Sequence, residues 1–257
     1  MEIQISDKKK KDIFVSIFQV LKNCSSLANI VFEPNFLHVQ GMDKSHVCLF
    51  DVKINKNWFT KYNLTEVIKI CLDTSVFFSI ISTKSDNQQL NIFFNSDNQD
   101  TLNIHFLPNG VKGEFKKRFK MSLVDYDYEE LFVPNVDYDA ELSLSSKQIN
   151  EIFSQLNNFG DDITIECSEN NVSLTTNGIT GEMKVDIQIE DLNSFAIVED
   201  EEVTINYSLS YINKMCITNK LSNDIEISLS KTYPMRISYD LGDDSFMVFY
   251  IAPKIII

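Results

Sequence analysis

The feature that most constrains this chain is an internal repeat of about half its length. Residues 17–42, IFQVLKNCSSLANIVFEPNFLHVQGM, and residues 152–178, IFSQLNNFGDDITIECSENNVSLTTNG, share one pattern at an offset close to 135 residues. Each has a short amphipathic helix, a turn, a strand, a polar turn and a second strand. A coarser match relates a helix at 74–84 and a strand at 90–94 to a helix at 209–219 and a strand at 225–229. A repeat of this size in 257 residues predicts two similarly folded domains.

Most other segments alternate apolar and polar residues, as half-buried strands do, and Asn, Asp, Ser and Gly turns separate them. Short turns between consecutive strands predict antiparallel sheets. Four short helices among many strands place the fold in the α+β class. We expect an N-terminal domain at 1–121, a connector at 122–136 and a C-terminal domain at 137–257.

Each of the four expected helices has one apolar face and one small polar or basic face. In the helix at 13–23, Ile13, Ile17 and Leu21 fall on the apolar side. In the helix near residue 78, Ser79 and Ser82 fall on the polar side. Two interpretations fit this pattern: four ordinary surface helices on sheets, or four equivalent helices whose polar faces line a channel. The pattern alone leaves both interpretations open.

The net charge of −14 argues at first against a nucleic-acid partner, because phosphate binding favours a basic surface. That argument fails for a protein that encircles DNA, since topology then holds the two together. The five cysteines show no CxxC spacing, and with three histidines a zinc site is not expected. We interpret the cysteines as reduced, buried side chains of an intracellular protein.

No apolar run approaches the roughly 20 residues of a membrane span, so no membrane partner is expected. The polar start MEIQISDKKKK does not fit a signal peptide. Its four lysines at 8–11 are interpreted as a solvated turn before a helix, with a nuclear-import signal as the alternative.

Motifs for chemistry are absent from the sequence. There is no GxGxxG, no GxxxxGK[ST] and no GxSxG, and glycine occurs only seven times. The adjacent acids at 161–162 and 243–244 fall in expected turns, where carboxylates are usually solvated. The sequence therefore predicts no enzymatic activity, no catalytic residue, no metal site and no cofactor.

Two segments near the middle of the chain stand out. Residues 121–135, MSLVDYDYEELFVPN, are acidic and aromatic and fit neither a helical nor a strand period, so we expect an extended connector. Just before it lies an expected strand at 113–123 with four basic residues. These fit either a solvated edge that resists aggregation or a surface for a partner.

Three motifs give the chain a specific resemblance. GMDKSHVCLFDV at 41–52, DYDYEELFVPN at 125–135 and FYIAPKI at 249–255 occur in the same order as in the proliferating cell nuclear antigen family of DNA sliding clamps. The resemblance covers essentially the whole chain. It implies a homotrimeric ring of six similar domains, in which helices line a hole for duplex DNA and sheets form the outer shell.

The resemblance also implies how subunits join. The strand at 113–123 would meet the strand at 180–189 of a neighbour, with a basic edge against an edge that carries acids. The implied interface residues are Lys116, Lys117, Arg118, Phe119, Lys120, Glu182, Lys184 and Asp186.

Partners of the family carry a short peptide with Gln, an aliphatic residue and two aromatics, the PIP-type peptide. The residues that match its apolar pocket are Met42, His46, Val47, Leu131, Val133, Pro134, Pro234, Tyr250 and Ala252. Ordinary core packing is the alternative for each of them, above all for Val47 and Ala252. Phe132 stands where the family has glycine before the proline, which puts the connector's local path in question.

The channel departs from the family, because many positions that match its basic residues are small and polar here. Lysines on or beside the four helices are the implied DNA-facing residues: Lys10, Lys11, Lys22, Lys84, Lys147, Lys214 and Lys220. We therefore expect weak, salt-sensitive, sequence-independent phosphate contacts that permit sliding.

The resulting prediction is a non-enzymatic processivity factor. A clamp loader would place the ring on DNA, and the ring would tether a DNA polymerase and other proteins with PIP-type peptides. The expected location is the nucleus, or a cytoplasmic replication site for a large DNA virus. The alternatives are a monomeric or hetero-ring accessory factor and an unrelated α+β hydrolase.

Overall fold

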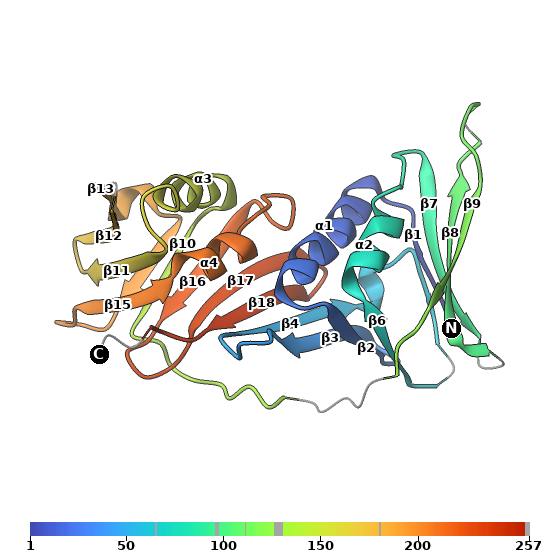
Figure 1. Cartoon of the computed structure of the whole chain (residues 1–257), viewed down its shortest axis with the longest axis horizontal. Coiled ribbons are helices and arrows are strands. Elements are labelled where there is room, and N and C mark those ends of the chain that lie inside the picture. Colours follow the sequence, from blue (N-terminus) through green and yellow to red (C-terminus); the bar gives the residue numbers. More distant parts are fainter. Residues whose placement is uncertain (65, 96–97, 111, 126–130, 180, 255–257) are drawn as a thin grey trace. The chain divides into compact units, whose positions relative to one another are not determined.

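The chain folds into two consecutive repeats of one element order (Figure 1). The computed structural model describes residues 1–64, 66–95, 98–110, 112–125, 131–179 and 181–254, without the side chains of residues 98 and 99. The first repeat comprises β1 (Glu2–Ile5), α1 (Lys8–Cys24), β2 (Leu27–Phe32), β3 (Phe36–Met42), β4 (Cys48–Asn55), a 3₁₀ turn (Lys56–Trp58), β5 (Lys61–Asn63), β6 (Ile68–Asp73), α2 (Thr74–Ile81), β7 (Gln88–Asn95), β8 (Asn98–Pro108) and β9 (Lys117–Ser122).

The second repeat has the same elements in the same order. They are β10 (Ala140–Ser145), α3 (Ser146–Leu156), β11 (Asp162–Ser168), β12 (Asn171–Gly178), β13 (Gly181–Gln188), a 3₁₀ turn (Ile189–Asp191), β14 (Ser194–Ile197), β15 (Val203–Ser208), α4 (Leu209–Met215), β16 (Asp224–Leu229), β17 (Met235–Gly242) and β18 (Ser245–Ile251). The predicted duplicated α+β fold is therefore confirmed.

The repeat extends to the register of the strands. Asn29 of β2 faces Gln40 of β3, and 135 residues later Thr164 of β11 faces Thr175 of β12. Leu27 likewise faces Asp73 in the first repeat, and Asp162 faces Ser208 in the second. The offset expected from the sequence thus holds in the two ladders of β2 and of β11, because hydrogen-bond register is set by the same alternating pattern in both halves.

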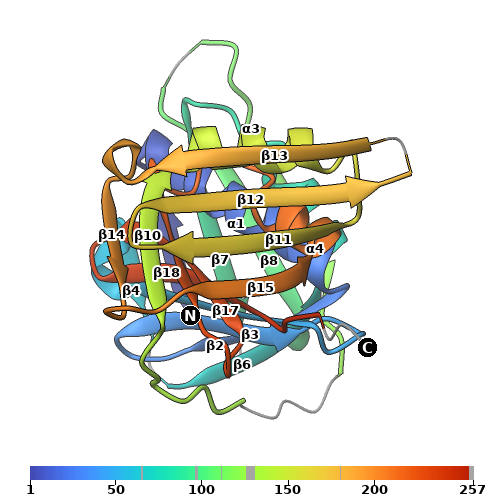
Figure 2. The same cartoon turned by 90° about the vertical axis from the view of Figure 1, so that its left-hand side faces the viewer.

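The strands form three sheets, of the orders β5-β1-β7-β8-β9, β14-β10-β16-β17-β18-β4-β3-β2-β6 and β13-β12-β11-β15. Within them each repeat contributes two runs of strands with the same order, and ladders such as β2–β3 and β11–β12 are antiparallel. Figure 2 shows β13, β12, β11 and β15 running side by side. The two helices of a repeat pack against each other, α1 on α2 and α3 on α4.

Contacts divide the chain into two compact units. The first unit contains Met1–Gly41, Asp51–Leu131 and Leu241–Met247, and the second contains Met42–Phe50, Phe132–Asp240 and Val248–Ile257. The expected boundaries at 121 and 137 remain a sequence prediction. Residues 126–130 of the expected connector lie outside the described residues.

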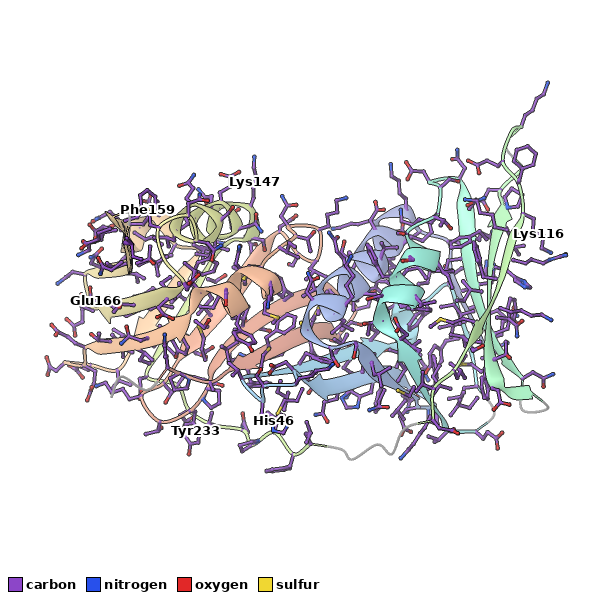
Figure 3. All side chains as sticks on the ribbon, in the orientation of Figure 1. His46, Lys116, Lys147, Phe159, Glu166 and Tyr233 are labelled. Carbon is purple, nitrogen blue, oxygen red and sulfur yellow. The ribbon has the colours of Figure 1, made fainter. Side chains whose placement is uncertain are left out.

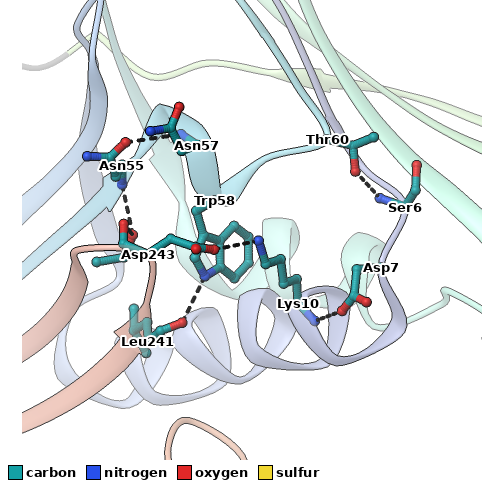
Figure 4. Close-up of polar contacts among 10 residues, drawn as sticks. Ser6, Asp7, Lys10, Asn55, Asn57, Trp58, Thr60, Leu241 and Asp243 are labelled. Carbon is teal, nitrogen blue, oxygen red and sulfur yellow. Dashed lines mark hydrogen bonds and ion pairs between the residues drawn. The ribbon is translucent and has the colours of Figure 1, made fainter.

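The first unit shows why its helices form where they do. Asp7 precedes α1, and its side chain accepts a hydrogen bond from the backbone N–H of Lys10 at 2.8 Å, which is the usual stabilisation of a helix N-terminus. Trp58 is fully buried beside α1, and its indole N–H donates to the Leu241 carbonyl at 2.9 Å (Figure 4). Phe14, Phe18 and Phe77 complete an aromatic cluster between α1 and α2.

Four predicted boundaries differ from the structure by three residues or more. Helix α2 ends at Ile81 instead of 84. The lysines at 8–11 form the first turn of α1 rather than a solvated turn, because the Asp7 cap starts the helix earlier. Helix α4 ends at Met215 instead of 219, where the β-branched pair at 217–218 follows. Strand β9 begins at Lys117 rather than 113, since Lys117 opposite Phe106 is its first ladder pair with β8.

Candidate functional site: an apolar pocket, a helical face and two sheet edges

An apolar cavity of about 210 Å³ lies within the second unit. It brings together all the residues that the sequence predicted for a peptide pocket except Leu131. The lining residues are Met42, His46, Val47, Leu49, Phe132, Val133, Pro134, Val136, Tyr138, Tyr233, Pro234, Tyr250 and Ala252. Leu131 does not line it. Its backbone N–H and carbonyl instead bond the side chain of Gln40, at 2.8 and 2.9 Å.

One wall of the cavity is the turn between β3 and β4, which Asp43 holds in shape. The buried carboxylate accepts the backbone N–H groups of Ser45, Val47 and Cys48 at 2.7–2.9 Å and the Tyr211 hydroxyl at 3.2 Å. Burial acts to raise the pKa of Asp43, but these hydrogen bonds outweigh it and lower the pKa below 3.8. His46 within the turn has a positive φ of 57°.

The opposite wall comes from the end of β18 and from the turn before β17. The backbone N–H of Ala252 donates to the Val47 carbonyl at 2.9 Å, which ties this wall to the β3–β4 turn. Tyr233 and Pro234 precede β17, and Figure 3 shows Tyr233 and His46 on the ribbon. Burial, followed by the neighbouring Tyr250, raises the pKa of Tyr138, so its phenol stays neutral at physiological pH.

Sequence reasoning missed five lining residues: Leu49, Phe132, Val136, Tyr138 and Tyr233. Alternation along β4 could have found Leu49, which follows Val47 by two positions on the same face. In the sequence, Phe132 marks only a position where the family has glycine, and it was not predicted as a lining residue. Phe132 lines this cavity and is 88% exposed as a residue, so the residue that replaces glycine adds a large apolar ring to the rim.

In the first unit, one lysine that was predicted to face DNA lies inside the protein. Lys11 is fully buried, and its ammonium donates to the backbone carbonyls of Ser85, Asp86 and Gln88, so its placement toward DNA was wrong. The helix starts at Lys8, which puts Lys11 on the face shared by Phe14 and Phe18. Desolvation, followed by the charge of Lys84, lowers the pKa of Lys11.

The other predicted lysines of this unit have partners on the protein. Lys10 pairs with Asp243 at 2.7 Å and lies 5.5 Å from the centre of the Trp58 ring (Figure 4). The side chain of Lys84 is 11% exposed and pairs with Asp12. Lys22 lies over the ring of Phe78 at 4.1 Å. The two ion pairs neutralise the charges of Lys10 and Lys84, while the Phe78 ring covers Lys22 without removing its charge.

Lysines of the second unit are more open. Lys147 on α3, Lys214 on α4 and Lys220 after α4 are all exposed, and Lys147 projects away from its helix (Figure 3). Lys214 lies 5.1 Å from the centre of the Tyr211 ring, which leaves its charge intact.

The predicted interface residues lie on two outer strands. In the part of the chain that the structure describes, β9 ends the order β5-β1-β7-β8-β9 and β13 ends the order β15-β11-β12-β13. Arg118 and Lys120 are exposed on β9, Lys116 is exposed just before it, and Glu182, Lys184 and Asp186 are exposed on β13. Lys117 and Phe119 are half-buried on the other face of β9.

The hairpin that carries β13 is held closely against the loop after α3. A Cβ atom on Gly178 would lie 1.8 Å from the carbonyl oxygen of Phe159, a residue labelled in Figure 3. Only glycine permits this approach. The outer strand is therefore presented by a well-anchored hairpin.

Further features of the described residues concern metal binding, cysteine reactivity and membrane-spanning helices. Within the described ranges, no three His, Cys, Asp or Glu side chains gather closely enough to hold a metal ion. All five cysteine side chains are buried, and burial raises the pKa of Cys167 and of Cys216 to about 12, so both remain thiols. No described helix combines the length and apolar character of a membrane span.

Comparison with known proteins gives matches along nearly the whole chain. The family model "Proliferating cell nuclear antigen, N-terminal domain" matches residues 5–130, and "Proliferating cell nuclear antigen, C-terminal domain" matches residues 132–254.

Individual relatives agree with the family models. The chain is 26% identical to "Proliferating cell nuclear antigen 1" of Plasmodium falciparum, over 94% of this chain and 93% of that protein. It is 30% identical to "Probable DNA polymerase sliding clamp 2" of Paramecium bursaria Chlorella virus 1, over 93% and 86%. The crystal structure of the Entamoeba histolytica protein superposes with a TM-score of 0.87 at 24% identity, over 99% of this chain and 98% of that one, and supports the fold.

Proposed function

The chain belongs to the proliferating cell nuclear antigen family of DNA sliding clamps, and from that premise we propose that it acts as a homotrimeric ring around duplex DNA. The observation that carries the proposal is the duplicated fold, in which β9 is an outer strand of the first repeat and β13 an outer strand of the second. Two such repeats per chain give six similar domains in a closed three-fold ring.

Ring closure would pair β9 of one copy with β13 of the next. An outer strand leaves N–H and C=O groups without strand partners, and this makes it a template for another chain. The charges favour these two edges: Lys116, Arg118 and Lys120 are exposed on one, and Glu182 and Asp186 on the other. Lys184 is the exception on the acidic strand.

DNA contact in the ring would be weak and independent of sequence. The exposed Lys147, Lys214 and Lys220 would supply phosphate contacts, while Lys11 would supply none because it is buried. Few contacts suit a protein that must slide, since each neutralised phosphate adds affinity and salt dependence. The clamp makes and breaks no covalent bond in this proposal. A loader places it on DNA.

The pocket would bind the short apolar peptide of DNA polymerase and other partners. Its lining is mostly apolar, with tyrosine hydroxyls and a histidine at fixed places, as small recognition pockets generally are. Met42 supplies an adaptable floor, and Pro134 and Pro234 stiffen the rim. Work on DNA would place the protein in the nucleus, or at a cytoplasmic replication site if its genome is that of a large virus.

The ring is tested by the mass of the protein in solution. Light scattering at moderate concentration should give about three times 29.6 kDa. A strict monomer at every concentration would contradict the homotrimer and favour a monomeric accessory factor. A trimer only in the presence of a related chain would favour a hetero-ring.

The pocket is tested separately, with a labelled peptide of the pattern Gln-x-x-aliphatic-x-x-aromatic-aromatic. Met42→Ala combined with Tyr250→Ala removes floor and wall, and we expect binding to fall at least about 100-fold, since two buried apolar contacts of about 1.5–3 kcal/mol each are lost. Val198→Ala serves as the control, because Val198 is exposed and does not line the cavity. Unchanged affinity of the double variant with an intact trimer would refute the pocket.

A further inference from the structure

The residues that line the apolar cavity divide into two groups by exposure. Eight of them, among them Met42, Leu49 and Tyr250, are half-buried and form its floor. The other five are exposed, and we call them the mouth residues: His46, Phe132, Pro134, Tyr233 and Pro234. None of the lining residues is Asp, Glu, Lys or Arg. A ligand group that enters through the mouth therefore meets rings and apolar surface, and no carboxylate, ammonium or guanidinium group.

The size of the cavity limits how much of a peptide its floor can hold. Its volume is about 210 Å³, which is below the roughly 300–1,000 Å³ of pockets that enclose a small-molecule ligand. The peptide pattern proposed above already brings one aliphatic and two aromatic side chains. A fourth large side chain of the same peptide would therefore lie at the mouth and not on the floor.

Two of the mouth residues present large rings to water. Phe132 is 88% exposed and Tyr233 is 42% exposed. They belong to separate segments, the connector and the turn before β17, and yet both line the same cavity. Burying a large apolar side chain against such rings contributes more binding free energy than placing a cation over an exposed ring. The mouth therefore favours an apolar occupant over a basic one.

The backbone beside each ring is anchored. Leu131 precedes Phe132, and its backbone N–H and carbonyl both bond the side chain of Gln40, at 2.8 and 2.9 Å. In the turn that carries the second ring, the backbone N–H of Lys231 donates to the Asp139 carboxylate at 2.6 Å. Rings that stand on a fixed backbone lose little conformational freedom when a ligand covers them, so more of the contact free energy appears as affinity.

We propose that Phe132 and Tyr233 form an additional subsite, which takes one large apolar side chain of the partner peptide from outside the pattern Gln-x-x-aliphatic-x-x-aromatic-aromatic. The inference rests on the peptide pocket proposed above and adds a fourth apolar position to its ligand. Glycine, which the family has at the position of Phe132, offers no side chain for such a contact. The subsite would thus select among partner peptides by a residue that the pattern does not specify.

A series of labelled peptides tests the subsite on the full-length protein. The reference peptide has the pattern with serine at the three positions on each side of it. In the other peptides, one flanking serine at a time is replaced by tryptophan or by arginine, and binding is measured by fluorescence anisotropy. We expect tryptophan at one flanking position to tighten binding about tenfold over serine, and arginine at that position to tighten it less than about threefold.

Protein variants show whether the two rings cause this gain. The measured quantity is the ratio of the affinities for the tryptophan peptide and the serine peptide, so a general change in binding cancels. Phe132→Gly and Tyr233→Ala should each reduce the ratio to within about twofold of one, and Phe132→Leu should keep about a threefold gain, because it retains apolar area without the ring.

The matched control is Asn135→Gly. It adds a glycine to the same connector at an exposed residue that does not line the cavity, and it should leave the ratio unchanged. A ratio that falls in Asn135→Gly as far as in Phe132→Gly would assign the effect to the connector's backbone and overturn the subsite.

The remaining outcomes separate the subsite from the pocket. A ratio that falls in both ring variants and not in the control supports the proposal. A ratio near one for the unmodified protein at every flanking position, a gain that survives Phe132→Gly, or a larger gain for arginine than for tryptophan overturns the subsite and leaves the pocket standing. Failure of the unmodified protein to bind any peptide of the pattern overturns both.

Discussion

At the residue scale, Asp43 and Lys11 are both buried charged residues, but a sequence motif helped to place only Asp43. Asp43 belongs to a motif that identifies the family, and the structure shows what the carboxylate does: it accepts three backbone N–H groups and so fixes a turn in the pocket wall. Lys11 belongs to a run of lysines that suggested solvent. The helix starts one turn earlier than its apolar pattern indicated, and that places Lys11 inside.

The role of Asp43 predicts a pH-dependent loss of stability in Asp43→Asn. Because its folded pKa is lowered, the carboxylate stabilises the fold above its ordinary pKa of 3.8 and loses that contribution as pH falls through the folded pKa. The amide keeps one acceptor but turns N–H groups toward Ser45 and Tyr211. We expect the free energy of unfolding to fall by about 1–3 kcal/mol near neutral pH, measured by urea denaturation.

That difference should shrink at a pH below 3.8, because the carboxyl of the unfolded chain takes up a proton there, and that of the folded protein follows as the pH falls through its lowered pKa. Tyr211→Phe removes only the longest of the four hydrogen bonds, at 3.2 Å, and should cause a smaller loss. An Asp43→Asn deficit that is the same at both pH values would show that shape rather than charge holds the turn.

At the element scale, the duplicated order of strands and helices was predictable because period-two and helical patterns recur at one offset. The ends of elements were less predictable. The cap at Asp7 and the ladder partner of Lys117 depend on neighbours distant in sequence. Eight pocket residues could be named only through the family resemblance, since they come from separate segments, and the resemblance did not point to Tyr138 or Tyr233.

The helices also divide into a shielded pair and an open pair, and this predicts unequal contributions to DNA binding. Lys147, Lys214 and Lys220 are exposed, whereas Lys10 and Lys84 are in ion pairs. Changing the first three to Ala should lower the slope of log affinity against log salt by up to about 2–3 for each copy in the ring, as about 0.9 is lost per phosphate contact. Duplex titrations at several salt concentrations measure it.

The matched control changes Lys10, Lys22 and Lys84 to Ala, which removes the same formal charge from residues that contact Asp243, Phe78 and Asp12. We expect a change in slope of less than about 1. Equal slopes for the two triple variants would mean that the ion pairs of the first unit open when DNA binds.

At the scale of the whole molecule, an acidic chain has to assemble with itself and also accept DNA. Each copy carries −14, and yet the edge that would join the next copy is basic. Long-range repulsion between copies and short-range attraction between β9 and β13 therefore oppose each other. Which one dominates depends on distance, because salt screens separated charges more strongly than charges in contact.

This opposition predicts that trimer assembly strengthens with salt at low ionic strength. Raising salt from about 0.01 M to about 0.1 M shortens the screening length from about 30 to about 10 Å, which removes most repulsion between copies. The exposed pairs of the edge contribute only about 0–1 kcal/mol each, so their weakening is the smaller effect. Sedimentation at fixed protein concentration should show more trimer at the higher salt, while affinity for DNA falls over the same range. If the trimer instead dissociates as salt rises, the contact between β9 and β13 owes its strength to charge pairs rather than to the strand ladder and its apolar residues.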